Sequence, residues 1–116
     1  VEANVKVNWL VSNILDITLP EGCAQLINDR WCFHHIAAAD RQAYSHQIGK
    51  MLALNGLLIL RGSLADSNVL NRIDQSVIDR YFPAPYFQRG AVILLNLPTN
   101  GVSVPSSLVV IRKMAQ

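Results

Sequence analysis

The sequence predicts an α/β fold of about five strands, in which a βαβ unit is followed by an antiparallel hairpin. An apolar run at residues 25–28 precedes an amphipathic stretch and a second apolar run at 57–60. Strand, helix and strand in this order form a unit with parallel strands. Two later apolar runs, at 90–97 and 107–112, are joined by residues 98–104 alone, which are too few for a helical crossover. These last two strands are therefore expected to form the hairpin.

The first expected strand is residues 5–11, which alternate apolar and polar side chains before becoming continuously apolar. It stops at Ser12-Asn13. Residues 18–22, with Pro20 and Gly22, are typical of a turn and separate this strand from the next.

The amphipathic stretch predicts the crossover helix. Its apolar residues fall at i, i+4, i+7 and i+8, as Tyr44, Ile48, Met51 and Leu52 do. Asp40 can cap its start. The pair Asn55-Gly56 is expected to close it, because both residues tolerate the left-handed conformation that follows many helices.

A second helix is expected before the hairpin. Residues 65–68 are polar and suit the capping of its start. Its apolar positions have helical spacing, and it must end before Pro83; these positions are Leu70, Ile73, Val77 and Tyr81.

The composition limits what the chain can do. Residues 1–116 suffice for one domain with its own core. Only 16% of the residues are charged, whereas about 25% are charged in an average domain. So little charge favours association with another chain, and a homo-oligomer is expected. The net charge of +2 is spread along the chain, which predicts no binding to nucleic acid. No apolar run approaches about 20 residues and no signal peptide is recognised, so a cytoplasmic protein without a membrane segment is expected.

No metal site or disulfide is expected. Cys23 and Cys32 lack a CxxC spacing, and reduced thiols are favoured over a disulfide. His34, His35 and His46 do not share an i, i+4 face and have no carboxylate pattern beside them, which argues against zinc.

Several segments, in this order, resemble the later part of a class I S-adenosylmethionine-dependent methyltransferase. Ser12-Asn13 followed by residues 19–22 (Leu-Pro-Glu-Gly) is similar to the family's strand end and Leu-Pro-x-Gly turn. Asp29 to His35 resembles the acid, aromatic and histidine residues after the next strand. Residues 50–61 are similar to a helix end that passes into a leucine-rich strand. The resemblance implies a partial Rossmann-like methyltransferase sheet that covers about the second half of the family's domain.

Four departures from the family bear on its cofactor. No glycine-rich loop precedes Asn13, and the family's ribose-binding acid has no counterpart. Asn13 stands where the family has an adenine-side Asp, and residues 54–56 stand in place of its Pro-Gly-Gly turn. No cofactor is therefore expected to bind to the chain alone. S-adenosylmethionine is expected only if a partner completes the fold.

The resemblance also implies a set of site residues. Asn13 and Ile14 would lie on the adenine side of the cofactor pocket, and Asp29, Arg30 and Trp31 would line its methionine side. His34 and His35 would lie near an acceptor substrate, where an imidazole could act as a general base. Plain structural roles stay open beside these. The two histidines suit a strand-to-helix junction, and Asp29 suits a cap or turn.

Two classes of function remain open. In the first, a truncated methyltransferase-like protein without catalysis of its own acts as an oligomeric binding or interaction module. In the alternative, it is part of a methyltransferase that a missing N-terminal segment or a partner chain, a second methyltransferase half, completes. In the family's sheet, two strands would separate residues 5–11 from the strand around Leu26. Their absence leaves that strand with an open edge, which association would cover.

Overall fold

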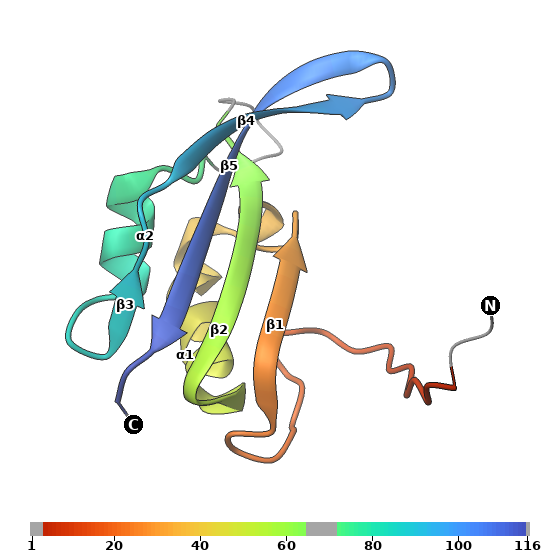
Figure 1. The fold of residues 1–116 in the computed structure, drawn as a ribbon, viewed down its shortest axis with the longest axis vertical. Coiled ribbons are helices and arrows are strands. Elements are labelled where there is room, and N and C mark those ends of the chain that lie inside the picture. Colours follow the sequence, from red (N-terminus) through yellow and green to blue (C-terminus); the bar gives the residue numbers. More distant parts are fainter. Residues whose placement is uncertain (1–3, 65–71, 116) are drawn as a thin grey trace.

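The computed structural model describes residues 4–64 and 72–115 (Figure 1). Five strands and two α-helices make up the fold, with two short 3-10 turns, η1 and η2, between the first strand and the first helix. In chain order the elements are β1 (Ala24–Arg30), η1 (Phe33–His35), η2 (Ala38–Asp40), α1 (Arg41–Met51), β2 (Leu52–Ser63), α2 (Gln75–Tyr81), β3 (Phe87–Arg89), β4 (Ile93–Thr99) and β5 (Val102–Lys113).

The five strands form one mixed sheet in the order β1-β2-β5-β3, with β4 also paired to β5. Strands β1 and β2 are parallel, and the register runs from Leu26 opposite Leu57 to Arg30 opposite Arg61. Helix α1 joins these two strands. The predicted βαβ unit is therefore confirmed.

Strands β4 and β5 form the predicted antiparallel hairpin. Its turn is only Asn100-Gly101, which have φ angles of 51° and 77°, and Thr99 pairs with Val102 across it. Asn-Gly is the preferred sequence for a two-residue hairpin turn, because both residues accept positive φ. Strand β5 is therefore longer than predicted and β4 begins and ends later than predicted, so that together they include most of residues 98–104.

Strand β3 was not expected from the sequence. Its three residues pair antiparallel with the end of β5, where Phe87 lies opposite Lys113. So short a run carries no alternation that could predict a strand. It lies along the same side of β5 as β4, which pairs further toward the hairpin turn.

Both helices pack on one face of the sheet, and the core lies between the helices and the sheet (Figure 1). The helix face predicted from apolar spacing is confirmed for Tyr44, Ile48 and Met51, which are all buried. The fourth predicted position, Leu52, is also buried but is the first residue of β2 and not part of the helix. The remaining buried apolar side chains come from the sheet, from η1 and from the α2 region; they are Phe33, Leu58, Leu60, Ile73, Ile78, Tyr81, Phe82, Val109 and Ile111. Neither described helix is long and apolar enough to cross a membrane.

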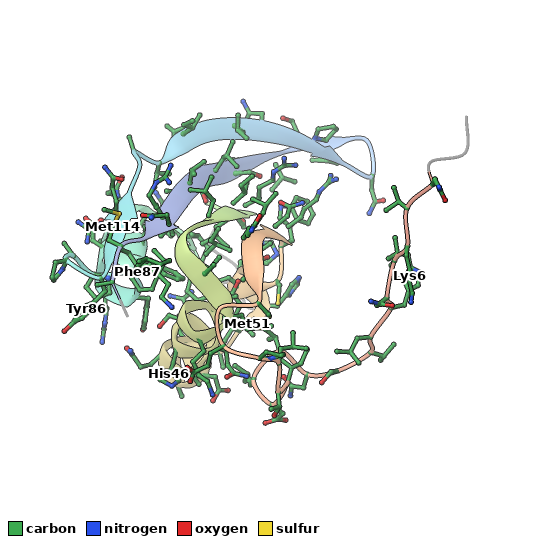
Figure 2. All side chains as sticks on the ribbon, turned by 60° about the horizontal axis from the view of Figure 1, so that its bottom comes forward. Lys6, His46, Met51, Tyr86, Phe87 and Met114 are labelled. Atoms are coloured by element: carbon green, nitrogen blue, oxygen red, sulfur yellow. The ribbon has the colours of Figure 1, made fainter. Side chains whose placement is uncertain are left out.

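The prediction of a strand at residues 5–11 is wrong. This segment is extended but has no strand pairing, and in Figure 2 it leaves the body of the molecule, with Lys6 far from the sheet. Its apolar side chains face solvent, with Trp9 90% exposed and Val11 103% exposed. Alternation is only half of what a strand needs. The other half is a neighbouring strand for its backbone, which the described residues do not supply.

The predicted helix ends also need correction. Helix α1 stops at Met51 rather than at Asn55-Gly56, and Asp40 occupies its N-cap position without a side-chain hydrogen bond. Helix α2 begins at Gln75, where the carboxylate of Asp74 accepts from the backbone N–H of Val77 at 3.1 Å. An Asp in this position satisfies one of the free N–H groups of the first turn. The caps predicted at residues 65–68 and the position of Leu70 lie outside the described residues.

Candidate functional site

Asp29 lies near the carboxyl end of β1, and its side chain points inward. It is only 5% exposed. Its carboxylate accepts hydrogen bonds from the backbone N–H groups of Cys32 at 2.7 Å and Phe33 at 3.2 Å, and from the hydroxyl of Tyr44. The carboxylate therefore holds the turn into η1 and ties it to α1. This geometry matches the cap or turn role that the sequence left open.

Tyr44 is the partner that makes burial of this carboxylate possible. Its ring stacks on that of Phe33 at 4.7 Å between centroids. Burial, and then the charge of Asp29, raises the pKa of the Tyr44 phenol. The phenol therefore stays protonated and donates to Asp29. A buried carboxylate needs such donors, because an unpaired charge is costly to remove from water.

His34 has a structural role in the same turn. It is 1% exposed, and its Nδ1 accepts from the backbone N–H of Ser63 on β2 at 2.9 Å. An Nδ1 that accepts must be unprotonated, so the neutral ring carries its proton on Nε2. Burial, with a smaller contribution from His35, lowers the pKa of His34 from its ordinary 6.5 to about 4.

This burial predicts a pH-dependent stability. Below pH 6.5 the unfolded chain binds a proton at His34, whereas the folded chain does so only near pH 4. The contribution of neutral His34 to the free energy of unfolding is therefore complete above pH 6.5, the pKa in the unfolded chain, and is lost as the pH falls from there toward 4. The free energy of unfolding is expected to drop by about 2 kcal/mol between pH 7 and pH 5 from this group. Urea unfolding followed by circular dichroism at a series of pH values measures it.

The matched control is His34→Asn, since the amide oxygen can take the place of Nδ1 as acceptor but does not titrate. Between pH 7 and pH 5 the free energy of unfolding of His34→Asn should fall by about 2 kcal/mol less than that of the wild type. Parallel pH profiles of the two proteins would contradict the assignment of this effect to His34.

Trp31 has an unusual backbone conformation for its residue type. Its φ angle is 72°, in the left-handed region, and its backbone N–H donates to the carbonyl of Arg61 at 3.0 Å. Large side chains rarely adopt this region, and residues that do are concentrated at functional sites. The indole Nε1 is buried and has no hydrogen-bond partner among the described residues. Trp31 therefore presents both backbone strain and an unused donor where β1 ends.

Two side chains near the end of β1 are open to solvent. Arg30 and His35 are exposed, whereas the residue that precedes each of them, Asp29 and His34 respectively, is buried. The ring of His35 meets that of His34 edge to face, at 4.5 Å between centroids. Of the two histidines predicted as candidate bases, His35 is therefore the one whose ring solvent reaches.

Asn13 and Ile14 lie on a different segment, which is held against α1. The carbonyl oxygens of Ile14 and Ile17 accept from the side-chain amide of Gln47 at 3.2 and 2.7 Å. The side-chain oxygen of Asn13 accepts from the backbone N–H of Leu15 at 3.0 Å, which closes its own turn. The structure thus gathers the predicted residues from Asp29 to His35 around one turn and places Asn13 and Ile14 beside the helix.

Sequence reasoning missed three residues that organise this region. Tyr44 was expected only as a core residue, and neither Gln47 nor Ser63 was singled out. Nothing in the local pattern marks them, because their partners lie 15, 33 and 29 residues away along the chain.

The side chains of Asp29 and Asn13 are both engaged in hydrogen bonds within the chain. The carboxylate of Asp29 already accepts three hydrogen bonds from this chain, and the side chain of Asn13 closes its own turn. An acid that receives a ligand hydroxyl or ammonium group must have free acceptor capacity at the surface. At this end of β1 the side chains of Arg30 and His35 are exposed, whereas the indole N–H of Trp31 is buried.

Solved structures with a similar fold include methyltransferases. A SAM-dependent methyltransferase from Methanosarcina mazei matches with a TM-score of 0.80 and 9% identity, over 96% of this chain and 69% of that chain. The 1,6-didemethyltoxoflavin-N1-methyltransferase of Burkholderia thailandensis, with bound 1,6-didemethyltoxoflavin and S-adenosylhomocysteine, matches at 0.73 and 14%, over 91% of this chain and 50% of that chain. The YcgJ protein of Bacillus subtilis matches at 0.67 and 10%, over 90% and 70%.

These likenesses confirm the fold predicted from the sequence resemblance. The chain spans between 50% and 70% of the length of these three proteins, as the later half of a class I methyltransferase domain would. At identities of 9–14% the likeness concerns the fold alone. No protein-family model matches the chain, and no curated protein matches its sequence.

Proposed function

We propose that this chain is a methyltransferase-like interaction module that does not methylate on its own, and that the free edge of β1 pairs with a second copy of the chain. The observation that carries this proposal is the position of β1. It is the parallel strand that leads into the candidate site, and among the described residues it pairs on one side only, with β2.

The backbone of β1 shows which groups face outward. Trp31 donates to the carbonyl of Arg61 on β2, so its N–H points toward the sheet. Backbone groups alternate along a strand. The N–H and C=O groups of Leu26, Asn28 and Arg30 therefore face away from β2. Such a row of unpaired groups is a template for another strand.

The side chains along β1 support pairing. Natural edge strands are commonly protected by charged residues or proline, yet Arg30 is the only charged side chain of β1 that is exposed. Leu26 is 58% exposed, although its neighbour in the sheet is the apolar Leu57. An added strand would remove apolar surface at Leu26 from water as well as satisfy the backbone.

A strand-blocking variant tests this proposal. Asn28→Pro removes an outward N–H and places a proline ring against any incoming strand, while the bonds from β1 to β2 are kept. Light scattering after size exclusion should give a dimer mass for the wild type and a monomer mass for Asn28→Pro, with equal helix and strand content by circular dichroism. Asn8→Pro, in the unpaired N-terminal segment, is the control and should stay dimeric.

A monomeric wild type over the whole accessible concentration range would sink self-association at this edge. A dimer that Asn28→Pro leaves intact would do the same, since the contact would then lie elsewhere.

The second candidate is half of a SAM-dependent methyltransferase, to which another polypeptide supplies the glycine-rich loop. The unused N–H and strained backbone of Trp31 favour it, because open α/β sheets bind ligands beyond the carboxyl ends of their strands. Calorimetric titration with S-adenosylhomocysteine, at a measured oligomeric state, tests whether the chain holds the cofactor without another polypeptide. Micromolar binding would mean that an assembly of this chain rebuilds a cofactor pocket. Absence of binding is the result expected for the module, and also for a half that another polypeptide must complete.

A further inference from the structure

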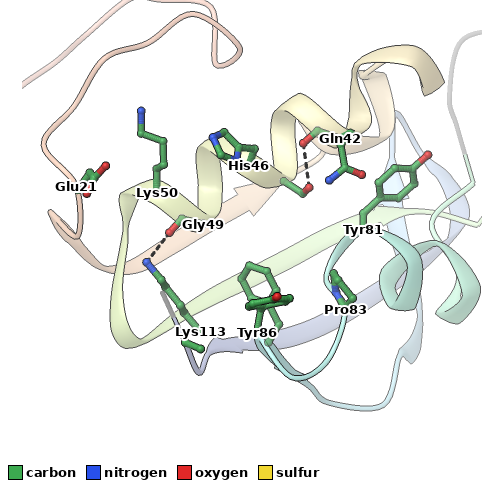
Figure 3. Close-up of a pocket in the computed structure, with 12 residues that line it drawn as sticks. Glu21, Gln42, His46, Gly49, Lys50, Tyr81, Pro83, Tyr86 and Lys113 are labelled. Atoms are coloured by element: carbon green, nitrogen blue, oxygen red, sulfur yellow. Dashed lines mark hydrogen bonds between the residues drawn. The ribbon is translucent and has the colours of Figure 1, made fainter.

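A cavity of about 410 Å³ lies at the opposite end of the fold from the candidate site (Figure 3). It opens between α1, the segment that joins α2 to β3, and the end of β5. The sheet register shows this separation. Lys113, which lines the cavity, follows Arg112, and Arg112 pairs with Leu57 near the start of the ladder between β1 and β2. Arg30, at the candidate site, pairs with Arg61 at the other end of that ladder. Its lining residues are Glu21, Gln42, Ser45, His46, Gly49, Lys50, Tyr81, Pro83, Tyr86, Phe87, Lys113 and Ala115.

One wall of the cavity is aromatic and is held by backbone contacts. The N–H of Phe87 donates to the carbonyl of Pro83 at 3.1 Å, and the carbonyl of Tyr86 accepts from Met114 at 2.7 Å. The ring of Phe87 packs edge to face on Phe82 at 5.4 Å. Tyr86 itself is 53% exposed, and in Figure 3 it lies between Lys113 and Pro83 and faces α1. The ring of Tyr86 is thus available for stacking on a ligand without a large rearrangement.

The facing wall is α1, from Gln42 to Lys50. A Cβ at Gly49 would lie 3.4 Å from Cζ of Phe87, so the two walls already approach each other at this point, and a larger side chain would displace the ring of Phe87. The buried Lys113 donates from Nζ to the carbonyls of Gly49 at 2.7 Å and Leu52 at 3.0 Å. These carbonyls would otherwise give the end of the helix a negative potential, which Lys113 offsets.

The lining of the cavity carries two ammonium groups, Lys50 and Lys113, and one carboxylate, Glu21. His46 and Lys50 are exposed and stand four residues apart, on one face of α1. Glu21 faces them from the turn before β1, which the bond from the N–H of Gly22 to the carbonyl of Lys50 anchors at 2.8 Å. With Lys113 at the inner end, the charges of the cavity complement an anionic group on a ligand.

We infer that this cavity binds a planar aromatic molecule that carries a carboxylate. The ring stacks on Tyr86, and the carboxylate reaches the ammonium group of Lys50 at the rim. Its size falls within the range of small-molecule sites, which combine apolar walls with a few placed polar groups. The site is independent of the proposed pairing at β1, since none of its lining residues belongs to that strand.

Calorimetric titration with two matched probes tests the inference. Indole-3-acetate has the ring and the charge, and indole-3-acetamide has the same shape without the charge. The acetate is expected to bind about tenfold more tightly than the acetamide. Lys50→Met should bring the two affinities together, whereas Lys6→Met, which removes an equal charge from the N-terminal segment, should leave their ratio unchanged.

Tyr86→Ala should weaken both probes by at least about tenfold, because it removes the stacking surface. Thermal unfolding of the same samples checks that the fold persists. Gly49→Leu should also weaken the binding of both probes, because the larger side chain enters the cavity while Tyr86 stays in place. Failure of both probes to bind the wild type at millimolar concentration would overturn the inference. Equal affinities for the two probes, or binding that survives Tyr86→Ala and Gly49→Leu, would overturn it as well.

Discussion

Replacement of Asp29 by alanine is expected to lower the free energy of unfolding by about 3 to 5 kcal/mol, the largest effect of any substitution considered for this chain. The carboxylate accepts from two backbone N–H groups and from the hydroxyl of Tyr44, all in a buried region. Each buried donor left without a partner costs about 1 to 3 kcal/mol. Alanine offers none of the three bonds, so the turn into η1 and its tie to α1 are lost together.

A double-mutant cycle with Tyr44→Phe resolves the contribution of the phenol. Phenylalanine keeps the stacking on Phe33 and removes only the donor to Asp29. Its own cost should be about 2 kcal/mol, and it should be smaller when Asp29 is already alanine, because the two residues share one bond. Urea unfolding measures all four proteins. Asp16→Ala, which removes an exposed carboxylate, serves as the control and should change stability by less than about 0.5 kcal/mol.

The cycle has a clear contrary result. If Asp29→Ala were as mild as Asp16→Ala, the inward orientation of this carboxylate would be wrong. Asp29 would then be free at the carboxyl end of β1, where the family resemblance had placed it toward a ligand.

Gly56→Ala is expected to have the second largest effect, a loss of about 3 kcal/mol. Gly56 lies in β2 where the register against β1 shifts, between the pairs at Ala24 and Leu26. A Cβ there would lie 2.7 Å from the carbonyl oxygen of Ala53 and 3.2 Å from those of Ala24 and Gln25. All three atoms belong to the backbone, so a side-chain rotation cannot relieve the contact. The backbone of β2 at Ala53 would have to shift, and β1 would have to move away from β2 where their ladder begins.

Gly49→Ala is the matched glycine-to-alanine control. Its Cβ would meet only a ring atom of Phe87 at 3.4 Å, and alanine favours a helix interior over glycine by about 1 kcal/mol. Chemical unfolding should therefore show a neutral or slightly more stable protein for Gly49→Ala and a marked loss for Gly56→Ala. Similar effects of the two substitutions would contradict the close approach of β1 and β2 at Gly56.

Local patterns in the sequence were sufficient for the central elements of this fold. The apolar spacing of Tyr44, Ile48 and Met51 identified the buried face of α1, because a helix repeats its side-chain directions every 3.6 residues. The run at residues 57–60 identified the centre of β2, and the length of the link at 98–104 identified a hairpin. In each case the signal lies within a few residues along the chain, and burial in the core agrees with it.

Other features depended on groups that are distant in sequence. Asn55-Gly56 suggests a helix end from its composition. In the structure the helix has already ended at Met51, and Asn55 carries the positive φ of 66° within β2. Gly56 is needed for another reason, the backbone carbonyl groups of Ala53 in β2 and of Ala24 and Gln25 in β1 that lie against it. Residues 5–11 have the alternation of a strand and yet remain unpaired, because pairing depends on a neighbour and not on the pattern.

The candidate site divides in the same way. The sequence by itself determined that Asp29, Trp31 and the two histidines follow a strand that leads into a helix, and therefore that they gather at one end of the sheet. Only the tertiary structure decided that the carboxylate of Asp29 and the ring of His34 turn inward, while His35 stays in solvent. The physical reason is that these polar groups can be buried only with hydrogen-bond partners. Their partners, the hydroxyl of Tyr44 on α1 and the N–H of Ser63 on β2, reach them only once the chain has folded.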